Sequence, residues 1–201
     1  AILSLKHTVV SVEDEITVAA GAELHLTRND AGLRGDGTAV ISGALVQSRA
    51  DLIDIAAIEI LAGGSWDLER STRLTLDGTD VTNAGTITLK SGNAILLRNA
   101  ANLVNSGTFN IDMTSSIHSR IEYRGGDKSF LYNYGTLNVN SANANTRVYV
   151  DYAIANYGAV NVNSGILYAA RRTDGPFTSH SGTVTVASGA TLLCGREVCD
   201  V

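Results

Sequence analysis

Charged and aromatic side chains gather in the stretch between residues 120 and 176, where polar segments interrupt a plainer chain. Segments 124–129 and 169–176 are rich in Gly, Arg and Asp, and a shorter polar junction lies at 151–152. Guanidinium and carboxylate groups hydrogen-bond sugar hydroxyls or acidic groups, and tyrosine suits sugar rings or protein partners. We therefore predict a ligand-binding site made by Arg124, Asp127, Lys128, Tyr149, Asp151, Tyr152, Arg171, Arg172 and Asp174. Ordinary polar loop decoration is the alternative.

The same residues make only a weak catalytic constellation. Asp127, Asp151 and Asp174 are able to approach one another, as the carboxylates of a polysaccharide lyase or hydrolase do. The accompanying Arg171 and Arg172 are too basic to abstract a proton unaided. No histidine has an acidic residue at a spacing typical of a catalytic pair. The Gly-x-Ser-x-Gly, phosphate-loop and His-Glu-x-x-His motifs are also missing from the sequence. We expect no catalytic residue, cofactor or metal, with a carbohydrate-active β-helix enzyme as the alternative function.

Two cysteines, Cys194 and Cys199, lie five positions apart near the end of the chain. A metal site needs more ligands than this pair, and no histidine neighbours them. We predict a small local disulfide in a secreted chain, with two free thiols in a cytosolic protein as the alternative.

Composition and charge exclude several classes of partner. The 201 residues include 15 Lys and Arg against 20 Asp and Glu, which gives a formal net charge of -5. This balance lacks the electrostatic footprint of a protein that binds a phosphate backbone, so we expect no nucleic acid partner. No apolar run reaches the roughly 18 residues that span a bilayer, so we expect no membrane insertion.

A repeat predicts the elements that must position these residues. A short sequence motif recurs every 21 to 28 residues: a glycine, then Thr or Ala, then alternating apolar and polar residues. We call this motif the phrase and its glycine the phrase glycine. Its glycines are Gly21, Gly43, Gly64, Gly85, Gly107, Gly135, Gly158 and Gly182. A second short strand-like run appears in each period, for example at 16–18, 58–60, 74–76 and 148–150, and no stretch has a sustained helical period. The pattern predicts an all-β fold, a single-stranded parallel β-helix of about eight coils.

Asparagines recur two residues before the phrase glycine, at Asn83, Asn105, Asn133 and Asn156. Stacked amide side chains hydrogen-bond from coil to coil, so we interpret them as a structural asparagine ladder. We expect one domain over 1–201, with an N-terminal cap at 1–15, coils at 16–186, and a C-terminal cap or a continuation of the solenoid at 187–201. Oligomeric state is left open.

The outward side of the phrase strand carries columns of Thr and Asn, among them Thr108, Thr136, Asn110, Asn138 and Asn161. A solvated β face is one interpretation, and a scaffold for self-association, docking or ice binding is another. Tyr134 and Tyr157 occupy one repeat position and are expected to stack.

The chain resembles the β-helical stalks of bacterial surface adhesins in two features. They are the sequence at 16–24 and the repeated Asn-x-Gly-Thr followed by alternating apolar residues. The resemblance is to autotransporter passengers and filamentous-haemagglutinin-type exoproteins, over residues 16–193. It implies a non-enzymatic adhesion module that is secreted or displayed at the cell surface. The implied partner is a glycan or a surface protein of a host or neighbouring cell.

Overall fold

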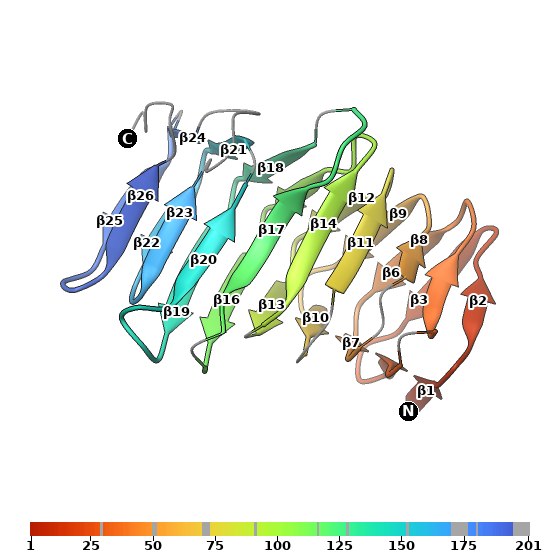
Figure 1. Ribbon diagram of the computed structural model, residues 1–201. Coiled ribbons are helices and arrows are strands. Elements are labelled where there is room, and N and C mark those ends of the chain that lie inside the picture. Colours follow the sequence, from red (N-terminus) through yellow and green to blue (C-terminus); the bar gives the residue numbers. More distant parts are fainter. Residues whose placement is uncertain are drawn as a thin grey trace.

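The chain folds as a three-sided parallel β-solenoid with the termini at opposite ends (Figure 1). This computed structural model describes residues 1–28, 30–49, 52–69, 73–90, 92–115, 117–127, 129–151, 153–169, 177–179 and 181–194. Within these ranges every regular element is a strand. No helix in this part of the chain is long and apolar enough to cross a bilayer. The predicted all-β parallel solenoid is therefore confirmed.

Successive strands visit three sheets in turn, so that each coil contributes one strand to each sheet. Sheet A contains β1 (Ile2–Leu5), β4 (Glu23–Leu26), β7 (Ala44–Gln47), β10 (Ser65–Leu68), β13 (Thr86–Lys90), β16 (Thr108–Met113), β19 (Thr136–Ser141), β22 (Ala159–Val162) and β25 (Thr183–Val186). Sheet B contains β2 (Val9–Ser11), β5 (Gly32–Arg34), β8 (Leu52–Asp54), β11 (Arg73–Asp77), β14 (Ala94–Arg98), β17 (Ser119–Tyr123), β20 (Arg147–Val150), β23 (Ile166–Ala169) and β26 (Thr191–Cys194). Sheet C contains β3 (Glu15–Val18), β6 (Thr38–Ile41), β9 (Ala57–Ile60), β12 (Asp80–Asn83), β15 (Leu103–Asn105), β18 (Phe130–Asn133), β21 (Ala153–Asn156) and β24 (Phe177–Ser179).

The repeat sets the register between coils. Every strand pairs in parallel with its counterpart in the next coil, and the phrase strands align residue for residue, as Ile87 with Phe109 and then Leu137. Alternation turns these apolar side chains inward, where they are fully or almost fully buried. Trp66 is buried in the same core, and its indole nitrogen donates to the side-chain oxygen of buried Gln47 at 3.2 Å.

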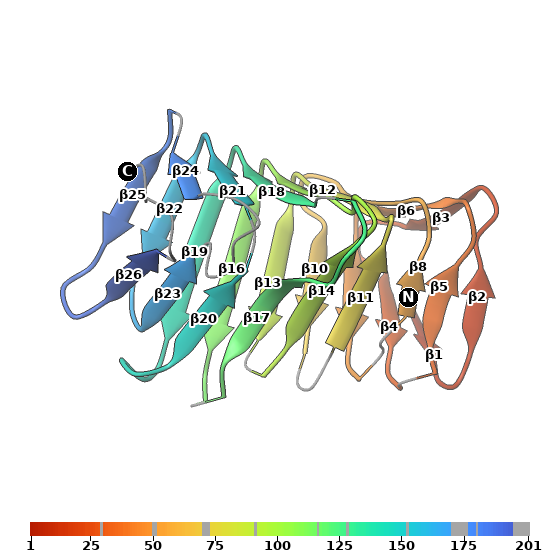
Figure 2. The same ribbon diagram turned by 45° about the horizontal axis from the view of Figure 1, so that its top comes forward.

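The third sheet is the feature that sequence reasoning missed. Runs at 74–76 and 148–150 lie in sheet B, whereas those at 16–18 and 58–60 lie in sheet C, so one apparent class of strand is two. In later coils sheet C is short and ends on the ladder asparagine just before the phrase glycine, which makes it resemble a turn. Figure 2 shows the strands of sheet C along the upper edge, separate from the other two faces.

The phrase glycines are needed for close approach of the backbone at the corner between sheets C and A. A Cβ atom on Gly135 would lie 2.1 Å from the carbonyl oxygen of Gly107, one coil earlier. The amide of Gly135 also donates to the carbonyl of Asn105 at 2.9 Å, which holds the corners together. Any side chain here separates neighbouring coils.

At the N-terminus, residues 1–15 contain β1 and β2, which pair with β4 and β5 as the first strands of sheets A and B. Ile2 and Leu3 are 68% and 55% exposed on this first rung. At the other end β26 pairs with β23, and residues 195–201 lie outside the described part of the chain. The cap assignments stay predictions.

Candidate functional site

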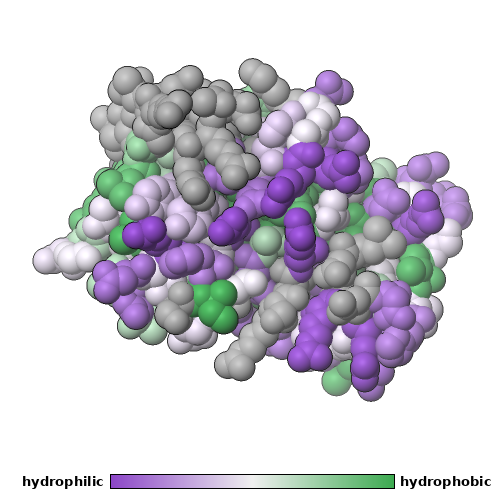
Figure 3. All heavy atoms as spheres, viewed as in Figure 1, coloured by the Kyte–Doolittle hydropathy of each residue, from purple (hydrophilic) through white to green (hydrophobic). Residues whose placement is uncertain are grey.

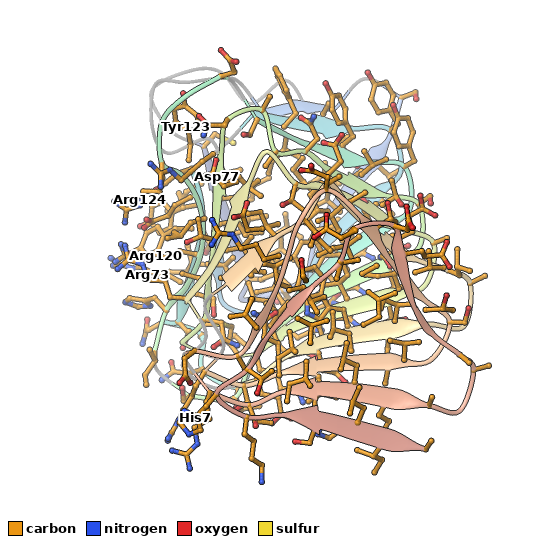
Figure 4. All side chains as sticks on the ribbon, turned by 90° about the vertical axis from the view of Figure 1, so that its right-hand side faces the viewer. His7, Arg73, Asp77, Arg120, Tyr123 and Arg124 are labelled. Carbon is orange, nitrogen blue, oxygen red and sulfur yellow. The ribbon has the colours of Figure 1, made fainter. Side chains whose placement is uncertain are left out.

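The outer face of sheet B carries a cluster of arginines, tyrosines and carboxylates over coils 6 to 8. Parallel pairing aligns Arg120 on β17 with Tyr149 on β20 and then Tyr168 on β23. Figure 4 shows the arginines of this face pointing away from the core, with Arg73, Arg120 and Arg124 on one side of the solenoid. In the view of Figure 3 hydrophilic side chains cross the same face. We call the arginine–tyrosine cluster the set Arg120, Glu122, Arg124, Arg147, Tyr149 and Tyr168.

Tyrosine rings form the floor of the arginine–tyrosine cluster. Tyr149 stacks on Tyr168 with 5.2 Å between ring centroids and meets His118 edge-on at 5.6 Å. The guanidinium of Arg120 lies over the Tyr149 ring at 5.4 Å, and that of Arg147 lies over Tyr168 at 5.6 Å. Tyr149 points outward as predicted, but it is only 7% exposed. Its ring is therefore covered in part by the Arg120 guanidinium, and its predicted part in ligand binding stays a prediction.

Glu122 fixes two of the arginines. Its carboxylate is 4% exposed and accepts from Arg120 at 2.9 Å on one oxygen and from Arg124 on the other. Burial by itself raises the pKa of Glu122, but the hydrogen bond from Arg120 and the charge of Arg124 outweigh it and lower the pKa. The hydrogen bond to Glu122 correspondingly raises the pKa of Arg120. Glu122 is therefore a carboxylate at neutral pH, and the Arg120 guanidinium beside it stays charged.

A second carboxylate lies beside Glu122. Ile121 pairs with Val150, and the amide of Asp151 donates to the carbonyl of Ile121 at 2.9 Å, which places Asp151 next to Glu122 across the strands. Asp151 is 2% exposed and contributes to the raised pKa of Arg120. Two buried carboxylates, Glu122 and Asp151, thus lie beneath the exposed cations Arg120 and Arg124.

The predicted site is brought together in part. Arg124 and Tyr149 belong to the arginine–tyrosine cluster, and Asp151 lies beside it, next to Glu122. Asp127 is exposed in the loop after β17, and its carbonyl accepts from the amide of Ala100 at 3.1 Å. Lys128, Tyr152, Arg171, Arg172 and Asp174 lie outside the described residues, so their contribution stays a prediction.

Sequence reasoning missed four members: Arg120, Glu122, Arg147 and Tyr168. They lie on strands rather than in loops, and the loops drew attention because of their Gly, Arg and Asp content. Aligning Ile121 with Val150 and Leu167 with Val148, as the inward residues of successive coils, would have stacked Arg120 on Tyr149 and Tyr168.

The Thr and Asn columns of sheet A align as predicted. On the outer surface Asn138 donates to Asn110 at 2.9 Å and Asn161 donates to Asn138 at 3.0 Å. A parallel row joins Asn140 to Asp112 at 2.7 Å and Asn163 to Asn140 at 2.9 Å. These side chains therefore use hydrogen-bonding capacity on one another that a partner would otherwise receive.

The inner asparagines form a continuous buried row. Asn83 donates to Asn105 at 2.7 Å, Asn105 to Asn133 at 2.7 Å, and Asn133 to Asn156 at 2.8 Å. The four side chains are 0% exposed, and all four also donate to main-chain carbonyls of sheet A at 3.0 to 3.2 Å. Each amide therefore joins two coils and two sheets.

Tyr134 and Tyr157 stack as predicted, with 4.8 Å between ring centroids and 8° between ring planes. The two side chains stay 53% and 37% exposed at the corner. Cys194 ends β26, and Cys199 lies beyond the described residues, so the disulfide stays a prediction.

Metal ligation has no support in the described part of the chain, where no group of three or more His, Cys, Asp or Glu side chains is placed to hold an ion. In comparisons with protein-family models, with curated proteins and with solved structures, nothing matches this chain.

Proposed function

We propose that this chain is a non-enzymatic β-solenoid binding module that recognises a glycan or protein partner through the arginine–tyrosine cluster. The carrying observation is that Arg120 and Arg124 are held by one buried carboxylate while Arg120 and Arg147 rest on stacked tyrosines. A guanidinium whose position is fixed in advance loses little conformational freedom when it binds an acceptor. Carboxylate, sulfate and hydroxyl groups are the acceptors that suit it.

A secreted or surface-displayed location, and an adhesin role, belong to this proposal. Their support is the resemblance of the repeat to bacterial adhesin stalks together with the solenoid architecture. The predicted disulfide between Cys194 and Cys199 is consistent with an oxidising compartment.

A carbohydrate-active enzyme is the second candidate because Glu122 and Asp151 lie side by side on one face. A glycosidase needs one carboxyl group that keeps its proton near neutral pH. The lowered pKa of Glu122 opposes that role for Glu122 itself, and both carboxylates are almost fully buried, where a substrate does not reach them. The binding module is therefore the better supported of the two.

The proposal is tested by a glycan array and a polysaccharide-degradation assay on one protein sample, followed by titration of any glycan bound. Arg147→Ala removes an exposed guanidinium from the arginine–tyrosine cluster. The matched control is Arg98→Ala, because Arg98 is an exposed arginine on β14 whose guanidinium lies 3.9 Å from the carboxylate of Asp77. We expect Arg147→Ala to weaken binding about tenfold or more, which corresponds to about 1.4 kcal/mol, with little change in Tm.

Two further variant sets separate the alternatives. Alanine at Tyr152, Arg171 and Arg172 asks whether the loops of the predicted site join the cluster. Asn138→Lys with Asn161→Lys places charges on the outer face of sheet A. Binding that is lost only in the sheet A variant would contradict the proposal, and so would release of oligosaccharides by the wild-type protein.

A further inference from the structure

A second surface lies at the corner between sheets A and B in coils 1 to 5, away from the arginine–tyrosine cluster of coils 6 to 8. It is an open groove of about 550 Å³. We call it the corner groove, and its lining residues are Lys6, Thr27, Arg28, Ser48, Arg49, Glu69 and Lys90. None of these described lining residues is aromatic.

The floor of the corner groove is a regular column that runs along the solenoid axis. Lys6, Thr27, Ser48, Glu69 and Lys90 recur at intervals of 21 residues and occupy the same position in successive coils. Backbone hydrogen bonds hold this column together: Thr27 to Leu5 at 3.2 Å, Ser48 to Leu26 at 2.8 Å, and Glu69 to Gln47 at 2.8 Å. At about 4.8 Å for each coil, five rungs extend over roughly 19 Å.

A second column beside the first supplies more positive charge. The position after the floor residue holds His7, Arg28 and Arg49 in successive coils, and the sequence continues the series with Arg70, which lies outside the described residues. Arg49 has a backbone φ of 61°, in the left-handed region where glycine is the least strained residue. A charged side chain is thus retained at a corner where glycine fits more easily.

Among the described lining residues of the corner groove, cations outnumber carboxylates. Its lining includes Lys6, Arg28, Arg49 and Lys90 against Glu69, whose carboxylate lies 3.0 Å from the ammonium of Lys90. Asp30 is close by and is 2.6 Å from His7, outside the lining set. These described lining residues therefore carry a local positive charge, whereas the chain as a whole has a net charge of -5.

We infer that the corner groove binds a linear acidic polysaccharide that lies along the solenoid axis. Cations repeated from coil to coil face the repeated carboxylate or sulfate groups of such a polymer, and arginine binds these groups through paired hydrogen bonds. Thr27, Ser48 and Glu69 place hydroxyls and a carboxylate between the cations, where sugar hydroxyls need donors and acceptors. Single-stranded nucleic acid is disfavoured because its bases stack on aromatic side chains, which the described lining lacks.

The experiment titrates the protein with polygalacturonate and dextran sulfate, with uncharged dextran and oligothymidylate as comparisons. Two variants test the corner groove: Arg28→Ala, at an exposed position, and Arg49→Gly, which removes the charge and relieves the left-handed backbone. Arg34→Ala is the matched control, because Arg34 is an exposed arginine on sheet B of the same coil as Arg28, 3.5 Å from Asp54. Thermal unfolding checks that each variant is folded, and Arg49→Gly is expected to remain so.

We expect each groove variant to weaken polysaccharide binding about fivefold or more and the double variant further, with affinity falling as salt is added. Arg34→Ala is expected to bind the acidic polysaccharides as tightly as the wild type does. Uncharged dextran is expected not to bind. The inference is overturned if the wild-type protein binds neither acidic polymer, if the double variant binds as the wild type does, or if oligothymidylate binds more tightly. Arg147→Ala addresses the arginine–tyrosine cluster separately, so that either site can fail without the other.

Discussion

The side-chain amide of Asn105 donates a hydrogen bond of 2.7 Å to Asn133, which lies 28 residues further along the chain. The equivalent bond from Asn83 to Asn105 spans only 22 residues and has the same length. The extra residues of the longer coil are therefore accommodated outside the ladder, around 114–118 and 124–129. Register at the corner is held while one side of the solenoid varies, and that side carries the arginine–tyrosine cluster.

The first prediction concerns the buried asparagine ladder. Asn105→Ala deprives the Asn83 amide of an acceptor and the Asn133 oxygen of a donor in a fully buried row. Unsatisfied buried polar groups cost about 1–3 kcal/mol, so we expect a loss of that size in urea unfolding. Asn163→Ala, in the exposed outer row, is the control and is expected to change stability by less than about 0.5 kcal/mol. Equal losses in the two variants would show that the inner row has no special role.

The glycine corner makes the second prediction. Gly135→Ala places a methyl group 2.1 Å from the carbonyl of Gly107, so neighbouring coils must separate. We expect destabilisation of about 2 kcal/mol or more. Gly63→Ala is the control, because Gly63 has a φ of +86° but nothing within 4 Å of the added atom, and its cost of about 1–2 kcal/mol reflects backbone strain alone. If unfolding shows Gly135→Ala to be the milder change, close approach is not the reason for glycine there.

The third prediction concerns pH. The arginines lower the pKa of Glu122 in the folded state, so its ion pairs stabilise the fold above the ordinary pKa of about 4.3. That contribution is lost as the pH falls through the lowered value. We expect the difference in Tm between wild type and Glu122→Gln to shrink between about pH 5 and pH 2. A constant difference across this range would contradict the assignment of a lowered pKa.

The fourth prediction concerns Cys194 and Cys199. Protein exported to an oxidising compartment is expected to contain a disulfide between them, two hydrogens lighter than the reduced form by mass spectrometry. Because the closed loop is short, reduction is expected to lower Tm only slightly. Alkylation of both thiols in unreduced, exported protein would overturn the pairing, and Cys199→Ser is the control for the modified peptide.

Much of the fold could be predicted from the sequence because each coil of a solenoid repeats the same local structure. Glycine at the corner, asparagine two residues earlier and an alternating strand recur together, so the coil length, the inward residues and the inner ladder follow from spacing alone. The stacking of Tyr134 on Tyr157 followed in the same way, since both occupy one repeat position. The division of the remaining residues between sheets B and C did not follow, because short apolar runs do not reveal which face they join.

The two candidate sites differ in how far residue spacing alone predicts them. The period of 21 residues already aligns His7 with Arg28 and Arg49, so the basic column was readable from position alone, although no groove was. Arg120 and Glu122 lie two residues apart on β17, but Tyr149 belongs to a coil of different length, so a fixed period does not align it with Arg120. Only the tertiary structure shows Arg120 held between Glu122 and the Tyr149 ring. Burial decided this arrangement, since the charge of a buried carboxylate is stable only where guanidiniums reach it, as Arg120 and Arg124 reach Glu122.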